Sequence, residues 1–178
     1  MHNLVEHMFA LSRFERGIIK IEPEIINIQD LLGEVLQYQA PQAERQEISI
    51  ELQIPVDPIL ISADPFRLTQ VVINLIGNAL NYTPRQSEIL IAVKQLEDDI
   101  IISFKDNGSG IEAEHIPNLF QPFYRASDDN KGAGLGLSIV HEIIKAHHGE
   151  ITVESTIGVG TTFHVRLPML QPTLDLKN

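Results

Sequence analysis

The sequence predicts an α/β fold, a two-layer sandwich in which about three helices cover one face of a mixed, mostly antiparallel sheet of about five strands. Helical and extended patterns follow one another in the order helix, strands, helix, strands, loop, helix, strands, which is typical of helices packed on a sheet. A chain of 178 residues is long enough to bury one such core. The sequence contains no internal repeat or low-complexity tract.

The first part of the chain carries two helix patterns and one pair of strand patterns. Residues 1–17 have apolar side chains at helical spacing and end in a glycine, which predicts a helix with one apolar face. Asp30 precedes a second helical pattern over residues 31–46. Residues 48–55 alternate as a strand does, and residues 58–64 are predicted to be its partner strand.

The rest of the chain is predicted from end signals as well as from periodicity. Asp64 and Pro65 form a helix start, with an N-cap followed by proline at the first helical position. Gly149 stands where a helix commonly ends in glycine. The predicted elements are a helix over 65–82, strands over 88–96 and 99–106, a helix over 137–148, and strands over 150–155 and 161–168.

Charge and composition narrow the classes of function. The chain has 24 acidic and 13 basic residues, and its net charge of −11 argues against a nucleic-acid-binding face. A phosphate ligand is still allowed, because backbone amides and a metal ion can hold one on an acidic protein. The absence of cysteine excludes disulfides and thiolate metal sites. No apolar stretch is as long as a membrane span and the N-terminus lacks a secretory pattern, so we expect a cytoplasmic chain without membrane contact.

Three glycines alternate just before the last helical pattern, at Gly132, Gly134 and Gly136. A P-loop would need a Gly-Lys-Ser/Thr ending, and a dinucleotide fingerprint would need G-x-G-x-x-G directly after a strand. Neither is present. The spacing favours a mobile lid whose backbone amides and helix N-terminus face an anion. A flexible hinge without a ligand is the alternative.

A second glycine-rich stretch surrounds Asp106, at the end of a β-branched strand pattern. Gly108 and Gly110 allow close approach of the backbone. A carboxylate only accepts hydrogen bonds, so it favours a base with an exocyclic amine, such as adenine, over the keto oxygen of guanine. The alternative is a simple hairpin turn, which is weakened because apolar alternation does not resume after it.

Asn74 and Asn78 lie four positions apart on the predicted helix and therefore share one face. Two amides on an otherwise apolar helix need partners, because buried unpaired amides are costly. Amide oxygens suit Mg²⁺, which also borrows ligands from substrate phosphates. The alternative for either residue is an exposed or back-bonded side chain.

Five motifs occur in a fixed order: NLIGNALNYTP, DNGSGI, LFQPFYR, GAGLGLSIV and GVGTTFHVRLP. Together they resemble the N, G1, F and G2 boxes and the closing strand of the catalytic and ATP-binding domain of two-component sensor histidine kinases, in the superfamily of gyrase, chaperone and mismatch-repair ATPases. The resemblance implies that residues 1–17 are the second helix of a dimerisation and phosphoacceptor hairpin. It implies a linker at 18–27, the ATP-binding domain at 28–168 and a tail at 169–178.

The resemblance implies ATP and Mg²⁺ as ligands and a role for each matched residue. Asn78 resembles the asparagine that coordinates Mg²⁺, and Asn74 lies beside it at the phosphates, so both are implied catalytic residues. Asp106 resembles the aspartate that recognises adenine, and Thr162 the threonine that helps to hold adenine through water. The residues implied at the nucleoside are Tyr82, Asp106, Gly108, Gly110, Ile111 and Thr162.

The ATP lid is implied between the F box and the last helix. Phe123 would anchor its first end, and for the neighbouring Phe120 core packing is an equal alternative. Arg125 would reach the γ-phosphate or a partner surface. The closing end of the lid would be Gly132, Gly134, Leu135, Gly136 and Leu137, and residues 126–133 are expected to be the least ordered part of the unliganded domain.

The chain departs from the family pattern in two respects. Asn81 stands where the family usually has a lysine, so one phosphate-neutralising charge is missing unless Arg125, Lys131 or another cation replaces it. The phosphoacceptor histidine is not found either. His2 and His7 lie on the implied second hairpin helix, the pair at the end of the last helix is expected to be structural, and the other histidines match no motif.

The implied activity is transfer of the γ-phosphate of ATP to a histidine outside these residues. That histidine would lie on the hairpin of the same or a partner subunit of a homodimer, and the receiver domain of a response regulator would take the phosphoryl group from it. Two alternatives remain. A stand-alone ATPase is disfavoured because Asn74 occupies the position of the water-activating carboxylate, and a nucleotide-binding regulatory module without transfer activity is motivated by Asn81.

Overall fold

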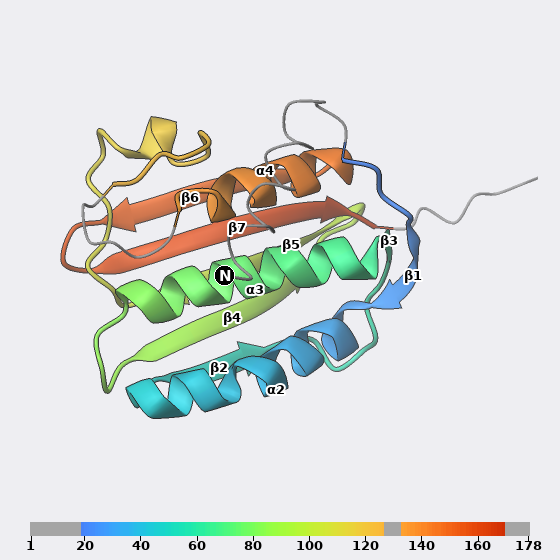
Figure 1. Cartoon of the computed structure of the whole chain (residues 1–178). Helices are drawn as coiled ribbons and strands as arrows, with labels where there is room; N and C mark the ends of the chain where they lie inside the picture. Colours follow the sequence, from blue (N-terminus) through green and yellow to red (C-terminus); the bar gives the residue numbers. More distant parts are fainter. Residues whose placement is uncertain (1–18, 127–132, 170–178) are drawn as a thin grey trace, which may run out of the picture.

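The computed structural model describes residues 19–126 and 133–169 (Figure 1). The predicted N-terminal helix over 1–17, nearly all of the predicted tail and most of the predicted lid lie outside these residues, so those predictions stay as they are. Among the described residues, no helix combines the length and the apolar character that crossing a membrane requires.

A five-stranded sheet forms one layer, in the order β2-β4-β5-β7-β6. β2 runs parallel to β4, and the other neighbouring pairs are antiparallel. This confirms the predicted mixed, mostly antiparallel sheet. The strands are β2 (Ser49–Gln53), β4 (Glu88–Gln95), β5 (Asp99–Asp106), β6 (Glu150–Thr156) and β7 (Gly160–Pro168).

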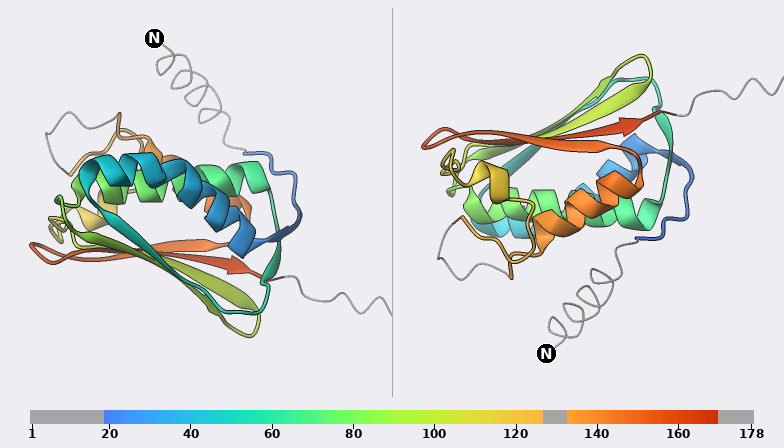
Figure 2. Two further views of the ribbon diagram at one scale, coloured as in Figure 1. Left: turned by 90° about the horizontal axis from the view of Figure 1, so that it is seen from below. Right: turned by 90° about the horizontal axis from the view of Figure 1, so that it is seen from above.

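Three helices form the second layer and cover the same face of the sheet, and no helix of the described residues covers the other face (Figure 2). They are α2 (Ile28–Gln46), α3 (Pro65–Tyr82) and α4 (Gly136–Ala146), and a short 3₁₀ helix, η1 (Ile116–Asn118), stands in the loop before α4. α3 packs between α2 and α4. This arrangement is the predicted two-layer sandwich.

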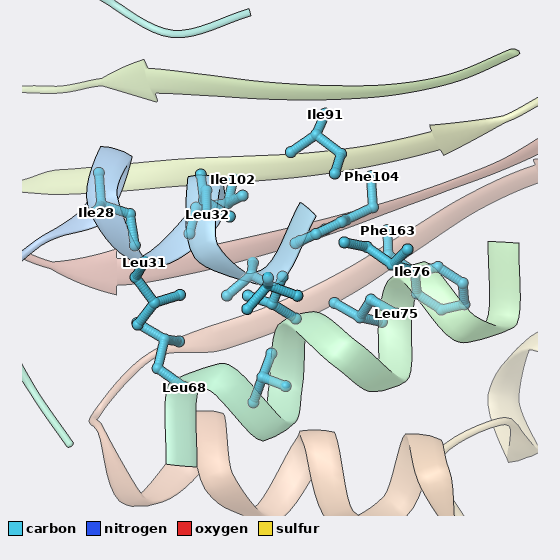
Figure 3. Close-up of a cluster of buried hydrophobic side chains, with 14 of the residues drawn as sticks. Ile28, Leu31, Leu32, Leu68, Leu75, Ile76, Ile91, Ile102, Phe104 and Phe163 are labelled. Atoms are coloured by element: carbon cyan, nitrogen blue, oxygen red, sulfur yellow. The ribbon is translucent and has the colours of Figure 1, made fainter. Parts of the chain in front are cut away.

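The hydrophobic core fills the space between the two layers (Figure 3). Leu32 of α2, Ile76 of α3 and Ile91 of β4 are all completely buried. Phe104 of β5 and Phe163 of β7 come from the strands that carry the functional loops. Burial of each such side chain contributes about 1.5–3 kcal/mol, so the core fixes the helices relative to the strand ends.

The predicted pairing of the first two strands is wrong. β3 (Leu60–Ala63) pairs antiparallel with β1 (Glu24–Asn27) in a separate two-stranded sheet, and β2 pairs with β4 instead. The prediction of a strand within residues 58–64 is correct, and Ile61 of this strand is 1% exposed. A strand pattern does not specify which strand lies alongside. β1 also falls in the segment that the sequence suggests as a linker.

The start of α2 differs from the prediction, and the start of α3 agrees with it. α2 begins at the N-cap Asn27, whose side chain accepts a hydrogen bond from Gln29 N, so Asp30 lies in the first turn. Asp64 caps α3 as predicted, because its Oδ1 accepts from Arg67 N at 3.0 Å.

At the end of α4 the left-handed residue is His148 rather than Gly149, with a φ of 59°. Gly149 N donates to the Ile144 carbonyl and His148 N to that of Lys145, which closes the helix in a Schellman arrangement. A Cβ on Gly149 would lie 2.4 Å from the Arg166 carbonyl oxygen. The glycine therefore serves close approach to β7.

Candidate functional site

One end of the sandwich contains a cavity of about 510 Å³. The C-terminal end of α3, the N-terminal end of α4, the η1 loop and the β6–β7 turn meet there, on the left in Figure 1. Eleven of the predicted site residues line it: Asn74, Asn78, Tyr82, Asp106, Gly110, Ile111, Arg125, Gly134, Leu135, Gly136 and Leu137. The fold thus brings together segments that are far apart in the sequence.

Four predicted site residues do not line the cavity as described. Gly108 and Phe123 are absent from its lining, and the Phe123 ring is exposed at the surface. Thr162 lies on the other face of β7, and Gly132 is outside the described residues.

Asp106 ends β5 and is 7% exposed. Its Oδ1 accepts hydrogen bonds from Gly108 N at 2.8 Å and from Thr161 N at 3.3 Å. Burial raises the pKa of Asp106, and these two backbone hydrogen bonds oppose the rise. The side chain is thereby held by one oxygen as a hydrogen-bond acceptor in the cavity wall.

The loop after Asp106 is clamped between two other segments. Ser109 N donates to the Tyr82 carbonyl at the end of α3, and Gly158 N in the β6–β7 turn donates to the Ser109 carbonyl. Gly110 has a φ of 72°, and a Cβ there would lie 2.1 Å from the Thr156 carbonyl oxygen. The glycine in this motif is therefore required by the approach of the turn.

Thr161, not Thr162, is the threonine of the cavity wall. Thr161 is 6% exposed, pairs with Asp106 across β5 and β7, and lines the cavity. Thr162 pairs with Lys105 and faces away, because successive strand side chains point to opposite faces. The sequence prediction chose the wrong one of two adjacent threonines.

Asn74 and Asn78 line the cavity from the same face of α3. Asn74 Nδ2 donates to the Gln70 carbonyl at 2.9 Å, and its Oδ1 lies against Gly136, where a Cβ would be 3.2 Å away. Asn78 makes no side-chain hydrogen bond with any residue in 19–126 or 133–169. Its amide is therefore available to a ligand, which fits the donor chemistry that Mg²⁺ takes from amide oxygens.

The two ends of the predicted lid are held together by backbone contacts. Phe123 N donates to the Gly134 carbonyl at 2.8 Å, and both residues have positive φ, 63° and 72°. The Phe123 side chain is 54% exposed, so its backbone rather than its ring makes this connection. Phe120 stacks on His141 with ring centroids 5.5 Å apart and packs against the core. α4 begins directly after this junction, and its N-terminus lines the cavity.

Motif reasoning missed His115 and Tyr124, which also line the cavity. His115 Nδ1 and the Tyr124 hydroxyl are 2.7 Å apart and join the η1 loop to the F box. His115 carries no motif signal, so only the folded loop identifies it. Among the described lining residues, Arg125 and His115 are the side chains that can carry positive charge, and Asn81 lies in the same wall.

This geometry agrees with what comparison with known proteins shows. A family model described as histidine kinase-, DNA gyrase B- and HSP90-like ATPase matches residues 63–171. The chain belongs to this ATPase family. The match includes all of α3, the Asp106 loop, α4 and β7, and so it covers the elements that build the cavity.

Sensor kinases are among the curated relatives. The chain is 32% identical over 174 residues to the adaptive-response sensory kinase SasA of Gloeothece citriformis, a match covering 96% of this chain and 44% of that protein. It is 30% identical to the sensor protein KdpD of Clostridium acetobutylicum, with 93% of this chain and 19% of that protein covered. The chain therefore spans less than half the length of these relatives.

Solved histidine kinase structures have the same fold. The catalytic domain of the histidine kinase ThkA superimposes with a TM-score of 0.76 at 29% identity, over 84% of this chain and 99% of that one. The Acinetobacter baumannii histidine kinase AdeS gives a TM-score of 0.78 at 27% identity, over 96% and 79% of the two chains. The chain is thus homologous to histidine kinase catalytic domains, as the five motifs predict.

Proposed function

We propose that this chain is the ATP-binding catalytic module of a sensor histidine kinase and transfers the γ-phosphate of ATP to a histidine outside these residues. The observation that carries the proposal is the cavity itself, which Asp106 of β5 lines together with Asn74 and Asn78 of α3. The names of the relatives support it, and so does full-length ShkA, solved in complex with AMPPNP, with a TM-score of 0.76 at 29% identity over 86% of this chain and 32% of that one.

Asp106 would read the base in this proposal. A carboxylate that its neighbours hold at Oδ1 accepts a hydrogen bond from the exocyclic amine of adenine. Thr161 lies beside it, and the partly exposed side chains of Tyr82 and Ile111 would pack along the nucleoside. The keto oxygen of guanine would meet an acceptor, so the site would select adenine nucleotides.

The other end of the cavity would hold the phosphates. The N-terminus of α4 offers backbone amides and a favourable dipole to an anion, beginning at Gly136. Asn78, with Asn74 beside it, would supply an amide oxygen to Mg²⁺, which neutralises charge on the phosphates when bound. Arg125 would take over part of the charge that the missing lysine at Asn81 would supply.

The chain's own part in the transfer would be positioning. The bond between the γ-phosphorus and the oxygen of the leaving ADP breaks while an imidazole nitrogen forms its bond to the same phosphorus. On α3, Asn74 occupies the position where a stand-alone ATPase would carry the carboxylate that activates water. An amide cannot accept a proton from water. Hydrolysis is thereby disfavoured against transfer to an imidazole that already carries a lone pair.

The organisation around this module is also a proposal. Residues 1–17 would continue a phosphoacceptor hairpin, 18–27 would link it to the ATP-binding domain at 28–168, and 169–178 would be a tail. The hairpin of the same or a partner subunit would supply the histidine, and a receiver domain would take the phosphoryl group. The cytoplasmic location expected from the sequence stays a prediction.

The test is transfer of label from γ-³²P-ATP in the presence of Mg²⁺. The chain alone should bind ATP and remain unlabelled, whereas a longer form that includes its hairpin should acquire acid-labile, alkali-stable label on histidine. Stable labelling of the isolated chain would contradict the proposal. ATP binding without label on the longer form would favour the regulatory alternative that Asn81 motivates.

A further inference from the structure

Ser155 lies on β6, and its hydroxyl contacts three residues of two neighbouring segments, Ile111 in the Asp106 loop and Gly160 and Thr161 on β7. Its Oγ accepts a hydrogen bond from Ile111 N at 2.8 Å and donates to the Gly160 carbonyl at 3.0 Å. Thr161 Oγ1, on the paired residue of β7, is 2.9 Å away. Ile111 and Thr161 line the cavity, whereas Ser155 does not. Any effect of Ser155 on a ligand is therefore exerted through these neighbours.

The other two hydrogen bonds of Ser155 determine which hydroxyl is the donor in its contact with Thr161. A hydroxyl has one proton and two lone pairs. Ile111 N only donates and the Gly160 carbonyl only accepts, so the Ser155 proton goes to Gly160 and one Ser155 lone pair goes to Ile111. The contact with Thr161 is then a hydrogen bond only if Thr161 donates its proton to the second lone pair. In that state Thr161 offers the cavity a lone pair.

We propose that Ser155 is a positioning residue for base specificity, which makes Thr161 a hydrogen-bond acceptor beside Asp106. This inference rests on the proposed nucleotide function and concerns the specificity of that same site. Thr161 N donates to Asp106 Oδ1, so the two acceptors share one edge of the cavity. Two adjacent acceptors favour the exocyclic amine of adenine, which Thr161 would contact through a water molecule. They disfavour a purine with a keto oxygen at position 6.

The experiment compares the binding of ATP and ITP by isothermal titration calorimetry at one Mg²⁺ concentration. ITP carries a keto oxygen at position 6, where ATP has an amine. In Ser155→Ala, Thr161 is released to donate to that oxygen, so the ratio of the ITP Kd to the ATP Kd should fall roughly three- to tenfold, the value of one neutral hydrogen bond. Ser103→Ala is the matched control, because it removes a strand hydroxyl bonded to His164 away from the cavity.

A second variant and a second background keep the test decisive. Ser155→Cys keeps the size of the side chain but has a weak donor and acceptor, so it should lower the ratio in the same direction. In a Thr161→Val background, Ser155→Ala should leave the ratio unchanged to within about twofold. Equal loss of affinity for ATP and ITP in both Ser155 variants would overturn the inference and leave the proposed function intact. A wild-type chain that binds ATP and ITP equally well would overturn the inference, whereas a chain that binds no ATP would overturn the proposed function.

Discussion

The backbone N–H of Asp64 donates a hydrogen bond to Nε2 of His147 at 2.9 Å, which joins the start of α3 to the end of α4. His147 Nδ1 is 2.8 Å from the Ile143 carbonyl oxygen, which only accepts, so the ring proton lies on Nδ1. Asp64 Oδ2 in turn accepts from Glu22 N. The ends of α3 and α4 that lie far from the cavity are thus tied to each other and to the chain entering the domain.

His147→Ala should destabilise the domain, because it leaves the Asp64 N–H without an acceptor in a buried position. His147 is 5% exposed, and an orphaned buried donor costs about 1–3 kcal/mol. Urea unfolding measures the loss. His148→Asn is the control at the neighbouring position. Its free energy of unfolding should stay within about 0.5 kcal/mol of wild type, because asparagine tolerates the positive φ of this residue. If His147→Ala is as stable as wild type, the contact between His147 and Asp64 does not stabilise the domain.

Asp106→Asn should preserve the stability of the domain and weaken its binding of ATP. Because burial raises the pKa of Asp106, the native state binds its proton more tightly than the unfolded chain does. The stability that this carboxyl contributes is present below its ordinary pKa of 3.8 and is lost as pH rises through the folded value. Asparagine keeps an oxygen for the Gly108 and Thr161 amides and removes the buried charge. At pH 7 the variant should unfold at no lower urea concentration than wild type.

The same variant should bind ATP at least about tenfold more weakly, because its amide N–H₂ can face the amine of adenine. Calorimetry on the folded variant measures this loss. A variant that is less stable than wild type and still binds ATP normally would contradict both the placement of the charge and the role of Asp106.

Gly134→Ala should weaken nucleotide binding without unfolding the domain. The φ of 72° and a Cβ position 2.8 Å from the carbonyl carbon of Phe123 make alanine strained at this junction. Strain of this kind costs on the order of 1–3 kcal/mol, enough for a roughly tenfold rise in the Kd for ATP. Gly33→Ala on α2 is the matched control, because no atom lies within 4 Å of its Cβ position. An unchanged Kd for Gly134→Ala would show that the junction does not shape the site.

Asn78→Ala should remove the dependence of ATP binding on Mg²⁺. Wild type should bind ATP more tightly with Mg²⁺ than with EDTA, and the variant should show the same Kd in both conditions, because an alanine supplies no oxygen ligand. Asn107→Ala, at an exposed position that does not line the cavity, should keep the wild-type difference. A persistent Mg²⁺ effect in Asn78→Ala would place the metal elsewhere.

Local signals in the sequence were sufficient for most elements and for most of the site. The Asp64–Pro65 pair and the apolar spacing after it predict α3 with its observed ends. The positions of Asn74 and Asn78 follow directly from that helix. The glycines around Asp106 and before α4 mark the two loops that the fold brings to one cavity.

The errors concern relations between distant segments. The sequence predicts β3 as a strand, but its pairing with β1 joins two segments that α2 and β2 separate in the chain. Thr161 and Thr162 have the same chemistry, and only the register of β7 against Asp106 distinguishes them. His115 and Ser155 make hydrogen bonds across loops and strands, which no local sequence pattern indicates.

The most direct test of the central claim is calorimetric titration of this chain with ATP and with GTP in the presence of Mg²⁺. The account predicts that ATP binds and that GTP binds at least about tenfold more weakly, because an acceptor-only carboxylate meets the keto oxygen of guanine. Equal affinities for the two nucleotides, or no binding of ATP, would contradict the assignment of Asp106 and of the cavity as an adenine nucleotide site.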